Sequence, residues 1–360
     1  MQLRDFIPAD ATDPNAPHLA ALSPGAALPG GHVDISGTTL GPIDGVLPTA
    51  LIGETPAAIA LSRSLRASVI VPEGAIAADL TLSHASHRSN PLPLRVAVPL
   101  IETVNPVSNP AVDEDGNIFV MVSGPRGEKV DVSIYRIDRD FQVRPFVRDL
   151  LNVSALAFDR DGFLYATSRA EGNVYRISPA GEISTFAEGM GVATGLAFDR
   201  DGNLFVGDRD GTIFKIARGV NGRSGEIFVF ATLEPSVAAY HLAFRDDGTL
   251  LVAAPTTSSN DVIHAIDPAG DATIYYRGLG RPQGMALDTA GNVYIAASLQ
   301  GRRGIVRITD GPTIDDRTAE LVLAGNDLVG LAFLEDGLAA LTTRTAVFHV
   351  ELGVQGRSIL

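Results

Sequence analysis

Arginine recurs in the short polar segments that follow one kind of apolar run. These segments read SGPRGEK, SRAEG, DRDG, SLQGRRG and TRT, and GLGRPQG adds one more. The arginines are Arg126, Arg169, Arg209, Arg281, Arg302 with its neighbour Arg303, and Arg344. A guanidinium group holds a carboxylate, phosphate or sulfate through two parallel hydrogen bonds. If the fold gathers these segments on one face, we predict that the face binds a small anionic or carbohydrate-derived ligand, such as a uronate or an aldonate. The alternative is that Glu128, Glu171 and Asp210 balance solvated arginines.

Residues at a second recurring position are further candidates for ligand binding and catalysis. Six related segments contain a run like GLAF, and the residues just before it are Ser108, Ser154, Thr194, Tyr240, Gln283 and Val329. In one copy His241 replaces the glycine of that run. We predict ligand contacts from Thr194, Tyr240, His241 and Gln283. The catalytic candidates are His241, Tyr240 and Glu234, because these groups can exchange protons. A hydrogen-bonded structural role for a lone histidine is the alternative.

Three acidic residues are candidates for a divalent metal site. Asp208 ends an apolar run, Glu234 lies in ATLEPSVAAYH, and Asp327 lies in LAGNDLVG. If their loops converge, they could hold calcium, zinc or manganese, and the alternative is that they are solvated loop residues. The motif DRDG does not fit a calcium loop, because apolar residues follow it where such a loop needs more ligands. We predict that DRDG is a turn.

Composition excludes several classes of function. The chain has 360 residues, no Cys, and 28 Lys plus Arg against 42 Asp plus Glu, a net charge of −14. Without Cys there are no disulfides, thiolate metal sites or cysteine nucleophiles. The negative charge argues against nucleic acid or an anionic membrane as partner. The N-terminus has no apolar signal segment, so we expect a cytoplasmic protein if the N-terminus is complete and an exported one if a signal peptide was trimmed.

A repeat must position these residues. The copies include ALAFDRDGFLYATS, GLAFDRDGNLFVGD and HLAFRDDGTLLVAA, and their turn glycines are Gly116, Gly162, Gly202, Gly248, Gly291 and Gly337. The steps between these glycines are 46, 40, 46, 43 and 46 residues. Each copy contains four short strand-like runs, which is typical of propeller blades. We therefore predict an all-β protein with a six-bladed β-propeller over residues 107–360.

The blades must pack on one another and close into a ring. We predict that Phe158, Phe198, Phe244 and Phe333 lie on inner strands and are buried between neighbouring blades. For closure the sequence leaves two alternatives. Either the last blade takes its outer strand from the C-terminal GVQGRSIL, or a strand near RVAVPLIETV supplies it.

Residues before the ring follow another pattern. Residues 17–97 contain about seven short apolar runs separated by Pro and Gly, which is typical of an immunoglobulin-like β-sandwich. We expect residues 1–16 to be an extension and the proline-rich residues 98–106 to link the sandwich and the ring.

Two stretches carry family resemblances. LSPGAALPGGHVDISGTTLG with RASVIVPEGAIAADLTLS resembles the IPT/TIG domain, which implies a spacer or a module that docks a protein partner or pairs with itself. The GLAFDRDGNLFV units resemble NHL-repeat and gluconolactonase (regucalcin)-like propellers of bacterial proteins. That resemblance implies a metal-dependent sugar lactonase or esterase-like hydrolase, whose metal is held by Glu, Asn and Asp at the channel mouth.

The sequence departs from the lactonase pattern at the equivalent positions before GLAF, where no copy has Asp, Glu or Asn. Neutral oxygens alone rarely offset the desolvation of a divalent cation. The first hypothesis is therefore a ligand-binding or scaffolding protein, and the metal-dependent hydrolase is the alternative.

Overall fold

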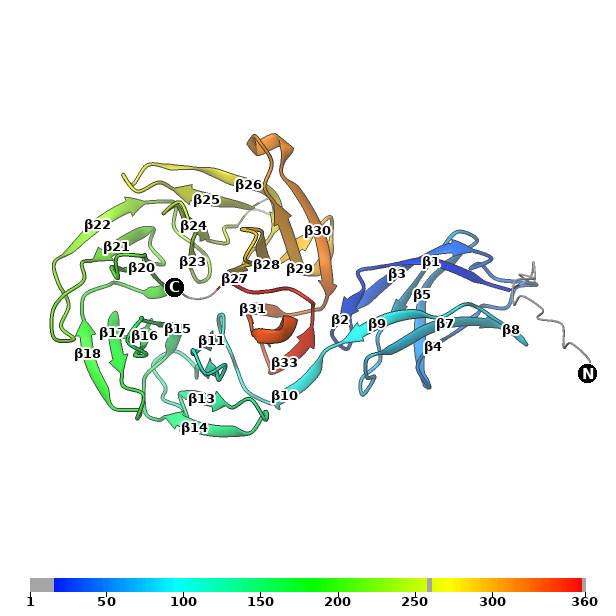
Figure 1. Ribbon diagram of the computed structural model, residues 1–360, viewed down its shortest axis with the longest axis horizontal. Helices are drawn as coiled ribbons and strands as arrows, with labels where there is room; N and C mark the ends of the chain where they lie inside the picture. The colour runs from blue at the N-terminus through cyan, green and yellow to red at the C-terminus, as the bar shows by residue number, and fades with distance from the viewer. Residues whose placement is uncertain (1–15, 258–260, 358–360) are drawn as a thin grey trace, which may run out of the picture. The chain divides into compact units, whose positions relative to one another are not determined.

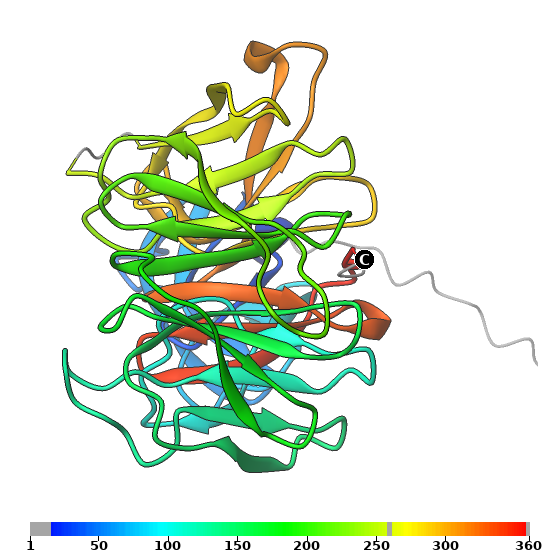
Figure 2. The ribbon, with the colours of Figure 1, turned by 90° about the vertical axis from the view of Figure 1, so that its left-hand side faces the viewer.

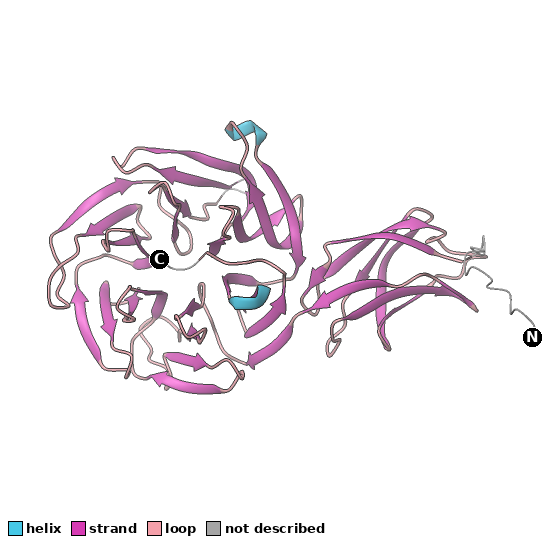
Figure 3. Ribbon diagram, viewed as in Figure 1, coloured by secondary structure: helices cyan, strands magenta, loops and turns pink. Residues whose placement is uncertain are grey.

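The computed structural model describes residues 16–257 and 261–357. These residues form an all-β protein in which strands and loops account for nearly everything (Figure 3). The only helical segments described are two short 3-10 turns, η1 (Ile314–Asp316) and η2 (Glu335–Gly337). No helix in the described part of the chain is both long and apolar enough to span a membrane. The chain divides into two compact units between Val96 and Ala97.

Nine strands are described in residues 16–96 of the N-terminal unit. They are β1 (His18–Ser23), β2 (Ala26–Ala27), β3 (His32–Thr38), β4 (Thr49–Ile52), β5 (Thr55–Arg63), β6 (Arg66–Ile70), β7 (Ala78–His84), β8 (His87–Arg88) and β9 (Leu92–Val96). Strand β3 pairs with β1 and β6, and β6 pairs with β5, all antiparallel. Strand β4 joins β5 to β7, and β7 pairs with β8 and β9. Strand β2 pairs with β9 in parallel.

Alternation along these strands builds a core for this unit. Val33 and Ile35, two residues apart on β3, are fully buried, and so are Leu80 and Leu82 on β7. Because successive side chains of a strand point to opposite faces, this spacing places each pair on one face of its sheet. The unit therefore has an apolar interior formed by its own strands.

The C-terminal unit is a β-propeller arrangement of short antiparallel sheets around an axis (Figure 1). Four four-stranded sheets are separate, and we call each a blade. Three of them follow chain order: β11 (Ala111–Val112), β12 (Ile118–Met121), β13 (Ile134–Ile137) and β14 (Val143–Val147); β15 (Val153–Phe158), β16 (Leu164–Ser168), β17 (Asn173–Ile177) and β18 (Ile183–Ala187); and β19 (Ala193–Phe198), β20 (Leu204–Asp208), β21 (Thr212–Ile216) and β22 (Ile227–Thr232). The edge-on view shows strands running from one face of the ring to the other (Figure 2).

The number of separate blades differs from the six predicted. The next strands are β23 (His241–Phe244), β24 (Leu250–Ala253), β25 (Asp261–Ile266), β26 (Ala272–Gly280), β27 (Met285–Leu287), β28 (Val293–Leu299), β29 (Arg302–Thr309) and β30 (Thr318–Ala324). They form one continuous sheet, because β26 is nine residues long and its last residues also pair with β28, Leu279 with Leu299 and Gly280 with Ser298. The long β26 thus bridges two meanders that the repeat predicts as individual blades.

The ring is closed by an N-terminal strand. The fourth separate blade consists of β31 (Leu328–Phe333), β32 (Leu338–Thr343), β33 (Ala346–Glu351) and β10 (Val98–Glu102). Strand β10 pairs antiparallel with β33, so the alternative near RVAVPLIETV is the one the structure adopts. Residues 98–102 of the predicted linker 98–106 thus form a strand of the ring, because the open edge of β33 offers them a hydrogen-bonding partner.

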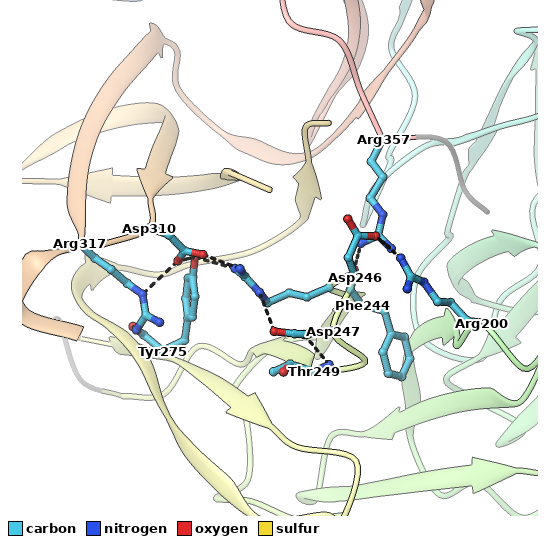
Figure 4. A network of polar contacts seen from close by, with 10 residues as sticks. Arg200, Phe244, Asp246, Asp247, Thr249, Tyr275, Asp310, Arg317 and Arg357 are labelled. Carbon is cyan, nitrogen blue, oxygen red and sulfur yellow. Dashed lines mark hydrogen bonds and ion pairs between the residues drawn. The ribbon is translucent and has the colours of Figure 1, made fainter. Parts of the chain in front are cut away.

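The described part of the C-terminal segment does not supply an outer strand and forms hydrogen bonds with other strands of the ring instead. The Arg357 N–H donates to the Leu287 carbonyl, and its guanidinium donates to the Phe244 carbonyl at 2.8 Å. Arg357 also pairs with Asp246, whose carboxylate pairs with Arg200 at 2.5 Å (Figure 4). The segment after β33 therefore ties the last blade to the sheet that contains β23 and β27. Residues 358–360 of GVQGRSIL lie outside the described residues.

The DRDG motifs are turns, as predicted. The Asp159 carboxylate accepts hydrogen bonds from the backbone N–H groups of Asp161 and Phe163, both at 2.9 Å. Gly162 has a φ of 77°, a conformation that glycine adopts without strain. The carboxylate thus stabilises its own turn.

Aromatic side chains fill the contacts between neighbouring blades. Phe205 on β20 packs edge-to-face on Phe230 of its own blade and on Phe244 of β23, with both centroid distances 4.9 Å. The same arrangement recurs at Phe119 and Tyr165. Of the four predicted phenylalanines, Phe158 is buried, whereas Phe198, Phe244 and Phe333 are half-buried. The most deeply buried aromatic residues of these contacts are those on the second strands, Phe119, Tyr165 and Phe205, because each lies between two other aromatic side chains.

Candidate functional site

Three of the predicted arginines occupy one position in three blades. Arg169 follows β16, Arg209 follows β20 and Arg344 follows β32. Their backbone N–H groups donate to the carbonyls of Asn152 at 3.2 Å, Val192 at 3.1 Å and Asp327 at 3.1 Å, respectively. Each acceptor lies just before the first strand of the same blade or within the loop that leads to it. The repeat therefore places all three arginines on one face of the ring, which we call the arginine face.

Arg126 is brought to this face by a loop that Asn152 holds in shape. The Asn152 side chain donates to the carbonyls of Gly124 at 3.1 Å and Pro125 at 2.9 Å and accepts from the Gly127 N–H at 2.8 Å. Asn152 is 2% exposed and has a φ of 44°, a left-handed conformation that asparagine tolerates better than most residues. Its amide thus fixes the β12–β13 loop against the next blade.

Arg126, Arg169 and Arg209 form a cluster of like charges, which we call the arginine cluster. Arg169 is half-buried, and its guanidinium donates to the Gly124 carbonyl at 3.4 Å. Its pKa is lowered, first by burial and then by the positive charges of Arg126 and Arg209. These two arginines are therefore close enough to repel Arg169, an arrangement that a bound anion would relieve.

No carboxylate of the described residues forms an ion pair with the arginine cluster. Of the acidic residues expected to balance it, Glu171 accepts a hydrogen bond of 2.6 Å from the Tyr175 hydroxyl. Among the described residues, Glu128, Glu171 and Asp210 thus form no ion pair with these three arginines.

The other predicted arginines are placed separately. Arg281 is exposed after β26, and its N–H donates to the Asp261 carboxylate at 3.1 Å. Arg302 pairs with Leu299 in the β28–β29 hairpin, and Arg344 is exposed at its own blade. The structure thus gathers three of the seven arginines and distributes the rest over other loops.

The polar residues at the start of the inner strands hold neighbouring strands together. The Thr194 hydroxyl accepts from the Tyr240 N–H at 3.0 Å and donates to the Gly207 carbonyl at 3.3 Å. The Ser154 hydroxyl donates to the Ala193 carbonyl of the next blade at 2.7 Å. Thr194 is 3% exposed, so its placement supports a structural role and not the predicted ligand contact.

Tyr240 and Gln283 are also engaged by the fold. Tyr240 is fully buried, and its hydroxyl donates to the Glu234 carbonyl. Burial, followed by the charges of Asp208 and Glu234, raises its pKa to about 12, which makes it a poor acid or base at neutral pH. Gln283 is half-buried, and its backbone N–H donates to the Ala296 carbonyl at 2.9 Å. Of the predicted inner-strand contacts, Gln283 alone keeps a partly exposed side chain.

His241 lies inside the ring against the segment that leads into the first blade. Its Nδ1 is 3.2 Å from the Ser108 hydroxyl, and both residues are 4% exposed. Burial lowers the pKa of His241 to about 4, so its imidazole is neutral at pH 7. The neighbouring Asn109 side chain donates to the Met285 carbonyl at 2.7 Å. This segment occupies the space beside His241, and the histidine is placed as a structural residue.

The predicted metal candidates do not form one site. Asp208 is buried, and its carboxylate accepts from the backbone N–H of Val192 at 2.9 Å. Glu234 and Asp327 are exposed on other loops. Within residues 16–257 and 261–357, no group of three or more His, Asp or Glu side chains is arranged to hold a metal ion. Asp208 thus shapes the loop that carries Arg209.

Sequence reasoning missed Asn152 and the buried carboxylate of Asp261. Asp261 accepts from the Thr256 hydroxyl at 2.7 Å and from the Arg281 N–H. A usable signal was present, because asparagine and aspartate often hydrogen-bond the backbone of their own loops. Aligning the loops between blades as well as the strands would have pointed to both residues.

The buried histidine predicts how stability depends on pH. The folded protein keeps His241 neutral down to about pH 4, whereas the unfolded chain takes up the proton near the ordinary value of 6.5. The contribution of the neutral His241 to the free energy of unfolding is therefore complete above pH 6.5. This contribution, roughly 3 kcal/mol, is lost as the pH falls towards 4. Urea denaturation at several pH values should show a smaller acid loss for His241→Gln than for the wild type. Equal losses of stability in the two proteins would contradict a buried neutral imidazole at His241.

Comparison with known proteins reveals relatives in fold but not in sequence. No protein-family model matches the chain, and no curated protein matches it significantly. A solved protein of unknown function from Bacteroides thetaiotaomicron matches 97% of this chain and 100% of its own, with a TM-score of 0.55 and 12% identity. An auxiliary nutrient binding protein from the same organism matches 94% of this chain and 98% of its own, with a TM-score of 0.53 and 12% identity.

A third similar structure covers less of this chain. A protein provisionally described as a gluconolactonase matches 73% of this chain and 94% of its own, with a TM-score of 0.56 and 19% identity. The structural neighbours are propeller-like proteins, and at such identities the likeness concerns the fold alone.

Proposed function

We propose that this protein binds a small anion, such as a sugar acid, on the arginine face. The observation that carries the proposal is the arginine cluster: Arg126, Arg169 and Arg209 lie on loops at one face of neighbouring blades, and none of them has a carboxylate ion-pair partner among the described residues. The charges of Arg126 and Arg209 also lower the pKa of the half-buried Arg169. Such a cluster holds a carboxylate or phosphate through charge-assisted hydrogen bonds. Hydroxyl groups on the ligand would suit the backbone carbonyls of the surrounding loops.

The two-unit architecture supports a binding role. The auxiliary nutrient binding protein matches both units of this chain. We interpret the N-terminal unit as an immunoglobulin-like domain of the IPT/TIG type that acts as a spacer or docks a protein partner. We interpret the ring as a six-bladed propeller of the NHL type. The meanders β23–β26 and β27–β30, whose strands pair in the same order as a blade, support this count.

The alternative function is a metal-dependent hydrolase of sugar lactones or esters. Its support is the similarity in fold between this chain and the protein provisionally described as a gluconolactonase. Metal analysis of the purified protein together with a lactone-hydrolysis screen separates the two functions. A stoichiometric divalent ion with turnover that a chelator abolishes would establish the hydrolase and contradict the binding proposal.

The binding proposal predicts the effect of removing Arg169. Calorimetric titration with a panel of uronates, aldonates and sugar phosphates should identify a ligand whose affinity falls as salt is raised. Arg169→Ala should weaken that ligand about 10- to 100-fold, because a charge-assisted hydrogen bond contributes about 1.5–3 kcal/mol.

Arg160→Ala is the matched control, because Arg160 is exposed on a DRDG turn of the same blade at the opposite face. This variant removes the same charge and should bind like the wild type. Equal weakening by both substitutions would mean that total charge, and not the arginine cluster, determines binding.

A further inference from the structure

The ring has a cavity of about 740 Å³ on the face opposite the arginine cluster. Its walls include the β11–β12 turn at Asp113–Gly116, the β15–β16 turn at Asp159 and Gly162, and the segment at Gln355–Arg357. These turns join the first and second strands of their blades, whereas the clustered arginines lie on loops between second and third strands. Because consecutive strands are antiparallel, the two kinds of loop lie at opposite edges of the blades. We call this cavity the turn-face cavity.

Aromatic rings form the apolar part of the turn-face cavity. Phe119, Phe146, Phe158 and Phe333 line it, from four different strands. Phe119 packs edge-to-face on Phe146 at 4.9 Å and on Phe158 at 5.1 Å, and Phe146 and Phe333 are half-buried. A cavity of this size is within the range of small-molecule sites, and aromatic walls provide apolar contact and faces that attract cations.

Charge in the lining is predominantly negative. The lining contains six carboxylates and two guanidinium groups; the carboxylates belong to Asp113, Glu114, Asp115, Asp159, Glu335 and Asp336, and the guanidinium groups to Arg136 and Arg357. Arg357 is already paired with Asp246, which does not line the cavity. An organic anion would therefore be repelled from this cavity.

Half of these carboxylates are already engaged. Asp113 accepts from the side chain of Asn117, Asp159 accepts from the backbone of its own turn, and Glu335 pairs with Arg139 at 3.0 Å. Glu114, Asp115 and Asp336 are exposed, and the structure describes no ion pair for any of them. These three carboxylates are free to face a cationic ligand.

We propose that the turn-face cavity binds an organic cation, an ammonium group attached to an apolar or aromatic body. The body would pack against the phenylalanine rings, and the ammonium group would lie between an aromatic face and the rim carboxylates. This site is separate from the arginine cluster in position and in charge, so it does not depend on the proposed anion-binding function.

The test uses the full-length protein and benzyltrimethylammonium as the probe. We expect saturable calorimetric binding at millimolar or lower concentration that weakens with added salt. Neopentylbenzene, the uncharged isostere of the probe, and benzoate should bind far more weakly, because the first lacks the charge and the second reverses it. Saturable binding of the cation with no preference over benzoate would overturn the proposal, as would no binding of the cation at all.

Variants locate the site. The double change Glu114→Gln with Asp336→Asn should weaken the probe about fivefold or more while leaving its apolar contacts. Asn accepts the left-handed backbone at residue 336, where φ is 59°, so the variant should fold. Gln355→Trp should block the cavity without changing its charge.

Asp271→Asn is the control for removal of a negative charge outside the cavity, since Asp271 is exposed on the β25–β26 turn and does not line the cavity. It should bind the probe like the wild type, as should Arg169→Ala. If Asp271→Asn weakens the probe as much as the rim variant, the cation is attracted by the net charge alone and the proposed site is wrong.

Discussion

Replacing Phe205 with alanine should lower the free energy of unfolding by about 3–5 kcal/mol. Phe205 is 2% exposed and packs edge-to-face on Phe230 and Phe244, so the substitution leaves a cavity between two neighbouring sheets and removes two aromatic contacts. Urea denaturation of the wild type and Phe205→Ala, followed by circular dichroism, measures the difference.

Phe228→Ala is the control for this prediction. Phe228 lies on β22 of the same blade but is 44% exposed, so its removal should cost less than about 1 kcal/mol. If the two variants were equally stable, the aromatic contacts between sheets would not be what holds the ring together.

Deleting β10 should also lower the stability of the ring substantially. A chain of residues 97–360 keeps the strand that pairs with β33, and a chain of residues 104–360 lacks it. The shorter chain loses the interstrand hydrogen bonds and the contacts of the half-buried Leu100 and Ile101, which together contribute roughly 3 kcal/mol or more. It also exposes the edge of β33, which favours aggregation.

Thermal unfolding of the two chains measures this difference. We expect a midpoint roughly 6–12 °C lower for the chain of residues 104–360. The full-length protein is the reference that shows whether the chain of residues 97–360 is itself intact. Equal midpoints for the two shortened chains would contradict closure of the ring by β10.

Much of this fold could be predicted from the repeat, because each copy contains its own turn and strand signals. The DRDG motif illustrates this: Asp159 and Gly162 act within five residues, and local sequence is sufficient to predict the turn. Ring closure is different. The choice between β10 and the C-terminal segment depends on contacts across more than two hundred residues, and both candidate segments are compatible with a strand.

The candidate site shows the same division between local and distant information. The repeat places Arg169 and Arg209 at equivalent positions, so their shared face follows from the sequence. The burial of His241 does not, because it depends on Ser108, which is 133 residues away in the chain. A position beside the axis looks accessible in the sequence pattern, but in the structure the segment before the first blade fills that space.

The proposed binding of an anion requires Arg126, Arg169 and Arg209 together. Its most direct test is the nuclear magnetic resonance signal of the Arg169 side-chain N–H groups, assigned with the Arg169→Lys variant, during titration with the tightest-binding anion from the calorimetric panel. We predict that the Arg169, Arg126 and Arg209 signals shift together and saturate at the calorimetric affinity, while the Arg160 signal does not move. Saturation without any shift of the three clustered arginines would place the anion elsewhere and contradict the account.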